Sequence, residues 1–245
     1  MTGLYRLADL NIEITSQYQS IHDMCKDYCA ENGSTPDFAV HITQAGIDYE
    51  REKAIPNDAS RERTVQDYPD DWLETNAVHR QIAEKLPDYG GFMLHGSAVA
   101  VNGDCFVFTA RSGIGKSTHT RLWRELLGER AVMVNDDKPL IRVAEKGTLV
   151  YGSPWDGKHH LSSNISVPLK AICVLERGEE NQIREIGIWE MMPKLLLQVY
   201  RPMNVAGTEK LMDVFDSMAL TVKFYRMQCN MDISAAKMSY TTMRG

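Results

Sequence analysis

Residues 105–123 read CFVFTARSGIGKSTHTRLW, and this stretch decides the fold. Its first part, CFVFT, is a continuous run of apolar and β-prone residues, which is typical of a buried strand. The part after Lys116 predicts a helix, because bulky side chains recur there on one stripe, formed by His119, Leu122, Trp123 and Leu126. A buried strand that passes straight into an amphipathic helix is typical of an α/β core.

The turn between them, ARSGIGKS (110–117), matches the phosphate-loop pattern with Ala110 in place of the first glycine. Glycines let consecutive backbone N–H groups turn inward around phosphate oxygens, and the helix presents its positive end to the same charge. A lysine there reaches the outer phosphates, and the following hydroxyl completes a Mg²⁺ shell. We therefore predict that ATP and Mg²⁺ bind at Arg111, Ser112, Gly113, Ile114, Gly115, Lys116, Ser117 and Thr118. Ala110 suits the pattern if its φ is negative.

The surrounding residues predict a mixed sheet. Before the loop, FMLHGSAVAV (92–101) reads as a strand joined to the next one by a hairpin turn at Asn102-Gly103. After the helix come a strand (130–136), a hairpin (140–153) and a buried strand (169–177). Helices over 188–200 and 207–219, a strand over 220–229 and a helix from 232 complete the chain. Hairpins, buried strands and helices together predict an α/β fold with a mixed sheet.

The first ninety residues differ from the rest. They predict a half-buried strand over 4–15, a short helix over 17–31, a strand over 38–43 and a helix over 72–86. Residues 51–71 have almost no apolar periodicity and predict a surface loop or a short edge hairpin. We expect residues 1–90 to form a small α+β subdomain for substrate recognition, and residues 91–245 to form the catalytic domain.

Composition excludes several classes of protein. The 245 residues carry 27 Lys+Arg against 33 Asp+Glu, and a net charge of -6 argues against nucleic-acid or anionic-membrane partners. No apolar run approaches the ~20 residues of a membrane span, and charged residues occupy the place of a secretion signal. Five scattered cysteines read as free thiols of a reducing compartment. We expect a cytoplasmic protein, and the sequence leaves open whether it is a homo-oligomer.

A pair of carboxylates follows the buried strand about twenty residues downstream of the loop, in Asn135-Asp136-Asp137. Phosphate-loop proteins hold a second metal ligand at the carboxyl end of such a strand. A second carboxylate there can take a proton from an acceptor hydroxyl. The alternative is a charged turn that begins the next hairpin, which Lys138-Pro139 would allow.

The order of these elements resembles a known family. LHGSAVAVNGDCFVFTARSGIGKSTHTRLW (94–123) followed by VMVNDD (132–137) is similar to the catalytic domain of HPr serine kinase/phosphorylase and, more distantly, to ATP-dependent phosphoenolpyruvate carboxykinase. Both families place a histidine, here His95, about twenty residues before the loop lysine, and both follow the loop with paired aspartates. The resemblance covers roughly residues 92–143.

The resemblance implies a carboxykinase-like P-loop core with His95 near the γ-phosphate or its metal. It implies that Ser117 and one aspartate, taken as Asp137, hold Mg²⁺, while the other aspartate is the base for a serine hydroxyl. It does not say which of Asp136 and Asp137 has which role. From the residues alone, His95 reads as a core histidine.

The sequence also departs from that family. A Gly-rich segment with a metal-binding glutamate has no match after Asp137, so HPr as substrate and a phosphorolytic reverse reaction are not implied. In its place stands YGSPWDGKHH (151–160), which we interpret as an acceptor-facing loop with Trp155, Lys158 and His159 as substrate contacts. An ordinary surface turn is the alternative. Arg201 is a candidate to stabilise the transferred phosphate, and is equally explained as a helix-end arginine.

The sequence thus predicts an ATP- and Mg²⁺-dependent kinase that phosphorylates a hydroxyl, a serine in a small protein, a modified peptide or the free amino acid. Its catalytic residues would be His95, Lys116, Asp136, Asp137 and Arg201. Two rivals remain, a decarboxylating carboxykinase-like lyase and a nucleotide-binding regulatory module without turnover. A phosphorylated product separates the kinase from both.

Overall fold

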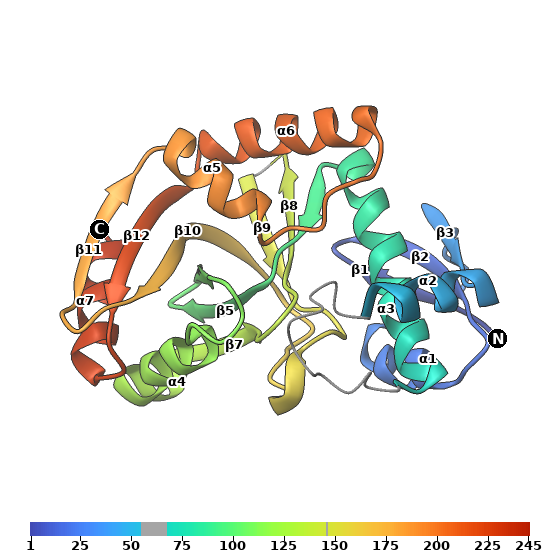
Figure 1. Cartoon of the computed structure of the whole chain (residues 1–245), viewed down its shortest axis with the longest axis horizontal. Coiled ribbons are helices and arrows are strands. Elements are labelled where there is room, and N and C mark those ends of the chain that lie inside the picture. Colours follow the sequence, from blue (N-terminus) through green and yellow to red (C-terminus); the bar gives the residue numbers. More distant parts are fainter. Residues whose placement is uncertain (55–67, 146) are drawn as a thin grey trace. The chain divides into compact units, whose positions relative to one another are not determined.

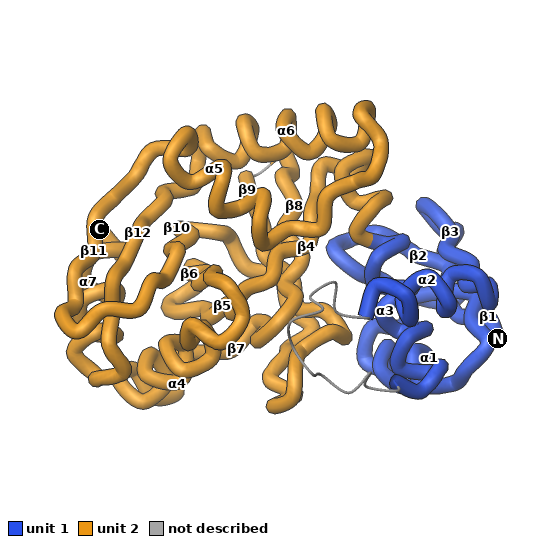
Figure 2. The backbone as a smooth tube through the Cα atoms, viewed as in Figure 1, with its two compact units in different colours: residues 1–82 blue, residues 83–245 orange. Residues whose placement is uncertain are grey.

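The structure, a computed structural model, describes residues 1–54, 68–145 and 147–245. The chain forms two compact units, residues 1–82 and residues 83–245 (Figure 2). In the described part of the chain, no helix combines the length and the apolar character needed to cross a membrane.

The larger unit is built on one mixed sheet. Its strands are β4 (Gly91–Met93), β5 (Gly96–Val101), β6 (Asp104–Thr109), β7 (Ala131–Asn135), β8 (Leu140–Ala144), β9 (Gly147–Tyr151), β10 (Ser166–Arg177), β11 (Gln182–Ile186) and β12 (Lys223–Cys229). Their order is β4-β8-β9-β10-β6-β5-β7, with β12 also paired to β10 and β11 to β12. The mixed α/β architecture predicted from the sequence is confirmed.

Five strand ends meet at one edge of this sheet. Strands β6, β10 and β12 run parallel to one another. Strand β5 is antiparallel to both β6 and β7, so β7 runs in the same direction as β6. The carboxyl ends of β6, β7, β10 and β12 and the amino end of β5 therefore lie on the same side, where ligands of open α/β sheets bind.

Helices cover both faces of the sheet. Helices α4 (Lys116–Leu127) and α7 (Ile233–Met243) lie on one face, and α5 (Ile188–Leu196) and α6 (Val205–Ala219) lie on the other (Figure 1). Alternate residues of each strand serve the two faces. In β6, Cys105 and Val107 pack with the α5 and α6 side, whereas Phe106 and Phe108 pack with the α4 side. Short 3₁₀ turns occur at Leu86–Tyr89, Gly128–Arg130 and Gly157–His159.

A buried serine joins α4 to α7. The Trp123 side chain is fully buried, and its Nε1–H donates to Ser239 Oγ at 2.8 Å. His119 Nε2 lies 2.9 Å from the same oxygen. Burial lowers the pKa of His119 to about 4, so this imidazole is neutral at physiological pH.

The smaller unit contains a three-stranded sheet in the order β1-β2-β3, formed by β1 (Thr2–Leu7), β2 (Leu10–Thr15) and β3 (Phe38–His41). The single strand predicted over 4–15 is wrong, because Ala8 and Asp9 have φ of 52° and 59° and turn the chain into a hairpin. The burial pattern follows this turn. Buried residues are odd-numbered up to Leu7 and even-numbered from Leu10, so the alternation changes phase at the turn.

Other predicted elements also change. The helix predicted over 17–31 is reduced to α1 (Ser20–Met24) and a 3₁₀ turn at Lys26–Tyr28. The loop predicted over 51–71 loses its first residues to the end of α2 (Gln44–Ala54) and its last to the start of α3 (Asp70–Lys85), and its middle, 55–67, lies outside the described residues. Helix α2 and strand β11 were not predicted, because each is largely exposed and has little apolar periodicity.

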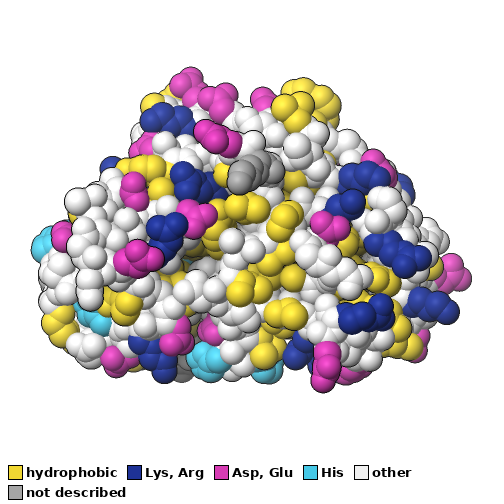
Figure 3. All heavy atoms as spheres, turned by 180° about the vertical axis from the view of Figure 1, so that it is seen from behind, with side chains coloured by type: hydrophobic (Ala, Val, Ile, Leu, Met, Phe, Trp, Pro, Cys, Tyr) yellow, Lys and Arg dark blue, Asp and Glu magenta, His cyan; other side chains and the backbone are white. Residues whose placement is uncertain are grey.

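Figure 3 shows one face of the molecule, on which Lys and Arg side chains stand among Asp and Glu side chains. This mixture fits the modest net charge of -6. Interspersed charges of both signs give a weak summed field over that face.

The contact between α4 and α7 predicts a stability effect. We expect Ser239→Ala to lower the free energy of unfolding by about 1–3 kcal/mol, because it leaves the buried Trp123 N–H without its acceptor. Urea denaturation of Ser239→Ala, with the exposed Thr242→Ala on the same helix as control, measures this. Equal midpoints for the two variants would contradict the role given to Ser239.

Candidate functional site

The loop of residues 110–117, called here the glycine loop, connects β6 to α4. Gly113 and Gly115 have φ of 80° and 121°, in the region that favours glycine. A Cβ on Gly113 would meet open space, so the backbone conformation, and not crowding, requires glycine there. Ala110 is not among the described residues with positive φ, so alanine is accommodated at this position.

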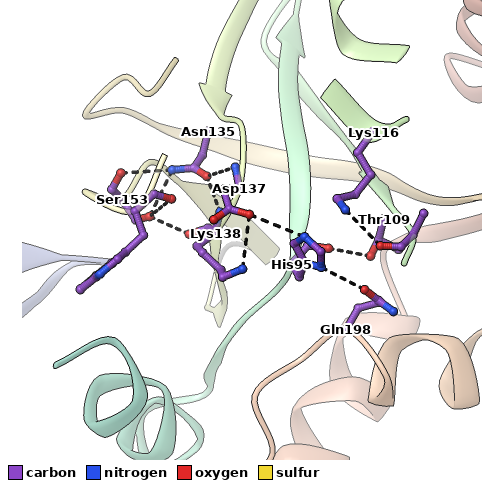
Figure 4. Close-up of polar contacts among 10 residues, drawn as sticks. His95, Thr109, Lys116, Asn135, Asp137, Lys138, Ser153 and Gln198 are labelled. Carbon is purple, nitrogen blue, oxygen red and sulfur yellow. Dashed lines mark hydrogen bonds and ion pairs between the residues drawn. The ribbon is translucent and has the colours of Figure 1, made fainter. Parts of the chain in front are cut away.

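Lys116 begins α4 and its side chain turns back along the loop. It is 8% exposed, and its Nζ donates to the carbonyl oxygen of Ala110 at 3.1 Å (Figure 4). Burial lowers the pKa of Lys116 to about 8, while the Asp137 carboxylate acts in the opposite direction. An anion bound beside this ammonium would stabilise its charged form.

The turn that follows β7 is held by a buried amide. Asn135 is fully buried, and its Oδ1 accepts from the backbone N–H groups of Asp137 and Lys138 at 2.8 and 2.7 Å. Its Nδ2 donates to the carbonyl oxygen of Ser153 at 3.1 Å. These bonds hold the backbone of the turn at Asp137 and Lys138 and tie it to the segment after β9 (Figure 4).

The carboxylate of Asp136 is connected to α4 through Ser97 and Thr120. Its Oδ1 accepts a hydrogen bond of 2.5 Å from the Ser97 hydroxyl on β5. The Ser97 oxygen in turn lies 2.8 Å from Thr120 Oγ1 on α4. This chain of short polar side chains orients a carboxylate that is only 8% exposed.

His95 precedes β5 and is fixed through its backbone and its ring. Its N–H donates to the Gln198 carbonyl at 2.7 Å, and its own carbonyl accepts from Thr109 Oγ1 at 2.8 Å. The ring Nδ1 lies 3.1 Å from Gln198 Oε1, and Nε2 lies 3.6 Å from Asp137 Oδ1. Figure 4 shows the imidazole between these two partners.

The contact between His95 and Asp137 is not an ion pair at neutral pH. Burial, followed by the charges of Lys138 and Lys116, lowers the pKa of His95 to about 4, although the carboxylate acts to raise it. The neutral ring carries one proton. Because the side-chain oxygen Oε1 of Gln198 can only accept, we expect that proton on Nδ1 and a lone pair on Nε2.

Two acceptors therefore face each other, the Nε2 lone pair and Asp137 Oδ1. An imidazole that donates its other N–H to an oxygen, and so aims its lone pair, is the usual arrangement of a histidine metal ligand. The described residues contain no group of three or more His, Cys, Asp or Glu that could hold a metal ion. This donor set suits a cation that takes its remaining ligands from phosphate and water. Lys138 Nζ, 3.3 Å from the same Asp137 oxygen, supplies positive charge here.

One pocket of about 500 Å³ brings the predicted residues together. Four separate segments form its walls: the glycine loop with the start of α4, the segment at His95, the turn with both aspartates, and the turn at 157–159. Its lining residues are His95, Ser112, Gly113, Gly115, Lys116, Ser117, Thr118, Asp136, Asp137, Gly157, Lys158 and His159. Gly157 has φ of 70°, and a Cβ there would lie 3.3 Å from the Asp137 Cβ, so this turn passes closely over the aspartate.

Four other predicted residues lie outside that pocket wall. Trp155 is only 7% exposed, so it is buried, and its backbone carbonyl accepts from the Lys138 N–H. Arg201 is exposed and is not among the described residues that line the pocket. Ile114 and Arg111 line neighbouring cavities on the other sides of the glycine loop.

The structure adds three residues that the sequence did not identify. Lys138 was interpreted only as part of a turn, although a lysine next to paired aspartates is a visible signal. Asn135 is a buried polar residue at the end of β7, and the sequence did not indicate a role for it. Gln198 reaches His95 across 103 positions of sequence, and no local pattern reveals such a contact.

Comparison with known proteins gives one family. Residues 63–191, more than half of the chain, match the family described as SynChlorMet cassette protein ScmC. The chain belongs to the ScmC family. The matched region contains His95, the glycine loop, both aspartates and the turn at 157–159, and it ends before Gln198.

Beyond the ScmC family, a search of curated proteins finds no match. Among solved structures, the HPr(Ser) kinase/phosphatase from Coxiella burnetii aligns over 62% of this chain and 99% of its own, with 10% identity and a TM-score of 0.35. A likeness at this level carries no argument about what this chain does.

The contact between Gln198 and His95 predicts a spectroscopic change. We expect Gln198→Glu to raise the pKa of His95 from about 4 toward its ordinary value, because a carboxylate beside Nδ1–H stabilises the imidazolium. Nitrogen NMR of labelled histidine, followed through a pH titration, reports both the tautomer and the pKa. The exposed Gln182→Glu on β11 is the control. An unprotonated Nδ1 in the unaltered protein would contradict the arrangement described.

Proposed function

We propose that this protein is a Mg²⁺- and ATP-dependent phosphotransferase that phosphorylates a hydroxyl group. The observation that carries the proposal is the single pocket lined by the glycine loop, Lys116, His95, the two aspartates and the 157–159 turn. These parts can bind a polyphosphate, a divalent cation and a hydroxyl acceptor within one volume. Phosphoryl transfer needs chiefly that positioning and charge neutralisation.

The glycine loop would hold the phosphates. Gly113 and Gly115 give the backbone the conformation in which consecutive N–H groups can converge on an anion. The amino end of α4 adds the positive end of its dipole. Lys116 is already desolvated, so its attraction to a phosphate is weakened little by water.

The pocket also fits a magnesium ion. Asp137 and the Nε2 lone pair of His95 would hold it, together with the Ser117 hydroxyl, which lines the same pocket. When bound, Mg²⁺ neutralises phosphate charge. Lys138 lies against the same carboxylate and adds a second positive charge to this side of the site.

Asp136 would then be the base. Ser97 holds one of its oxygens, which fixes the carboxylate plane at the pocket wall. As the acceptor oxygen forms a bond to the γ-phosphorus, the bond from that phosphorus to the β,γ-bridging oxygen breaks, and Asp136 takes the hydroxyl proton. The products are the phosphorylated acceptor and ADP.

The acceptor would approach from the 157–159 turn. Lys158 and His159 are exposed at the pocket rim and can contact a polar or anionic group. We propose a serine as acceptor, in a small protein, a modified peptide or the free amino acid. We also propose that the first ninety residues recognise this substrate and that the reaction takes place in the cytoplasm. Trp155 is buried and Arg201 is exposed, and neither lines this pocket.

The direct test is incubation of the whole protein with Mg²⁺-ATP and a panel of hydroxyl acceptors, followed by mass spectrometry. We expect one acceptor to gain a phosphoryl group. Lys116→Ala should lower turnover by at least about 100-fold, because it removes a preorganised charge at the transferred group. The exposed Lys237→Ala on α7 is the control. Binding of ATP without any phosphorylated product would favour a regulatory module, and a decarboxylated product a lyase.

The two aspartates should respond differently. Asp136→Asn should lower kcat by at least about 100-fold with little change in nucleotide affinity, since it removes the base. Asp137→Asn should raise the Mg²⁺ concentration that gives half-maximal rate. Rates measured across a Mg²⁺ titration separate the two effects, with Asp104→Asn at the opposite end of β6 as control. The reverse pattern would exchange the two roles.

A further inference from the structure

A second pocket, of about 410 Å³, lies on another side of the glycine loop. It is formed where three parallel strands end. The glycine loop follows β6, Arg177 and Gly178 stand at the end of β10, and Cys229 to Met231 stand at the end of β12. The paired ends of β10 and β12 face each other at Arg177 and Cys229.

This pocket adjoins the first pocket, because the two share lining residues. Gly113, Gly115 and Thr118 line both. A molecule whose phosphates occupy the first pocket can therefore extend along the glycine loop into the second. The Asp136 and Asp137 side of the site, where the acceptor is expected, stays separate from it, because neither aspartate lines the second pocket.

The walls of the second pocket suit a flat aromatic group. Ile114 and the nearly buried Leu122 supply apolar contacts, and Met231, which is 78% exposed, stands at the rim. The guanidinium of Arg177 is held in place because its Nη2 donates to the Gly113 carbonyl at 2.5 Å. A planar guanidinium fixed in this way can stack on an aromatic ring.

The Asn230 side chain at this pocket is already engaged. Asn230 Nδ2 donates to the Glu179 carbonyl, and its Oδ1 accepts from the Asp232 N–H. The amide therefore holds the turn after β12 in shape. Contact with a ligand would come from the apolar wall and from Arg177.

We propose that this second pocket binds the nucleoside part, a purine base with its ribose, of a nucleoside triphosphate whose phosphates lie on the glycine loop. The inference rests on the function proposed above and names the part of the site that distinguishes ATP from bare polyphosphate. Cys229 lies in the pocket wall and gives a chemical probe of its occupancy.

The test uses the reactivity of this thiol. Cys25, Cys105 and Cys173 are buried and Cys29 is exposed, so Cys29→Ser leaves Cys229 as the most accessible of the four remaining thiols. Burial raises the pKa of the Cys229 thiol, so alkylation with iodoacetamide is run above neutral pH. The modified peptide is quantified by mass spectrometry with Mg²⁺-ATP, with Mg²⁺-tripolyphosphate, and with neither.

We expect saturating ATP to slow alkylation of Cys229 at least about fivefold, because the nucleoside covers the sulfur, and tripolyphosphate to change it little. Equal protection by the two ligands, or no protection by bound ATP, would overturn the inference while leaving the proposed function intact. Failure of both ligands to bind in calorimetry would overturn the proposed function, and this inference with it.

A pair of variants provides a second measurement. Cys229→Phe fills the pocket and should weaken ATP binding at least about tenfold without changing tripolyphosphate affinity. Met231→Ala should also weaken ATP binding, by a smaller factor. It keeps the test valid if the larger side chain in Cys229→Phe prevents folding. The control is Met203→Ala, since Met203 is 80% exposed and lines neither pocket. The assignment would be contradicted if Cys229→Phe lost affinity for both ATP and tripolyphosphate. It would also be contradicted if neither Cys229→Phe nor Met231→Ala lost affinity for ATP.

Discussion

Strand β5 lies between β6 and β7 and runs antiparallel to both. This one pairing makes β6 and β7 point the same way, so the glycine loop and the Asn135 turn leave the sheet at the same edge. It also brings His95, at the amino end of β5, to that edge. The pocket forms because the directions of these three strands bring the segments that follow β6 and β7 and precede β5 to the same edge of the sheet.

Burial sets the electrostatics of that edge. Lys116, Asp136 and His95 are taken out of water by the sheet and its helices, which weakens the protonated forms of the lysine and the histidine. Hydrogen bonds from Ser97 and to Gln198 hold the groups in fixed directions. The site is therefore preorganised, in the sense that its dipoles and charges are aimed before any ligand arrives.

The residues matched to the ScmC family include all the residues that line the first pocket. The matched residues end at 191, after the turn at 157–159 and before Gln198. Gln198, which contacts the His95 ring, therefore lies beyond the matched region. So do the end of β12, which lines the second pocket, and α7, which packs against α4. The match over 63–191 includes the glycine loop, His95 and both aspartates, and it leaves out the ends of the site formed by the rest of the chain.

The sequence by itself determined the glycine loop, the strand before it and the helix after it, since these depend on local patterns of apolar residues and glycine. It also indicated the mixed α/β class, and it selected His95, Lys116, Asp136 and Asp137, all of which line one pocket. The single strand predicted over 4–15 is wrong, because the chain turns at Ala8 and Asp9 and forms two strands. Strand order, the partner of His95, the burial of Trp155 and the pocket at the end of β12 were decided only by the tertiary structure. Each of these depends on contacts between residues far apart in the chain, and such contacts leave no periodic trace in the sequence.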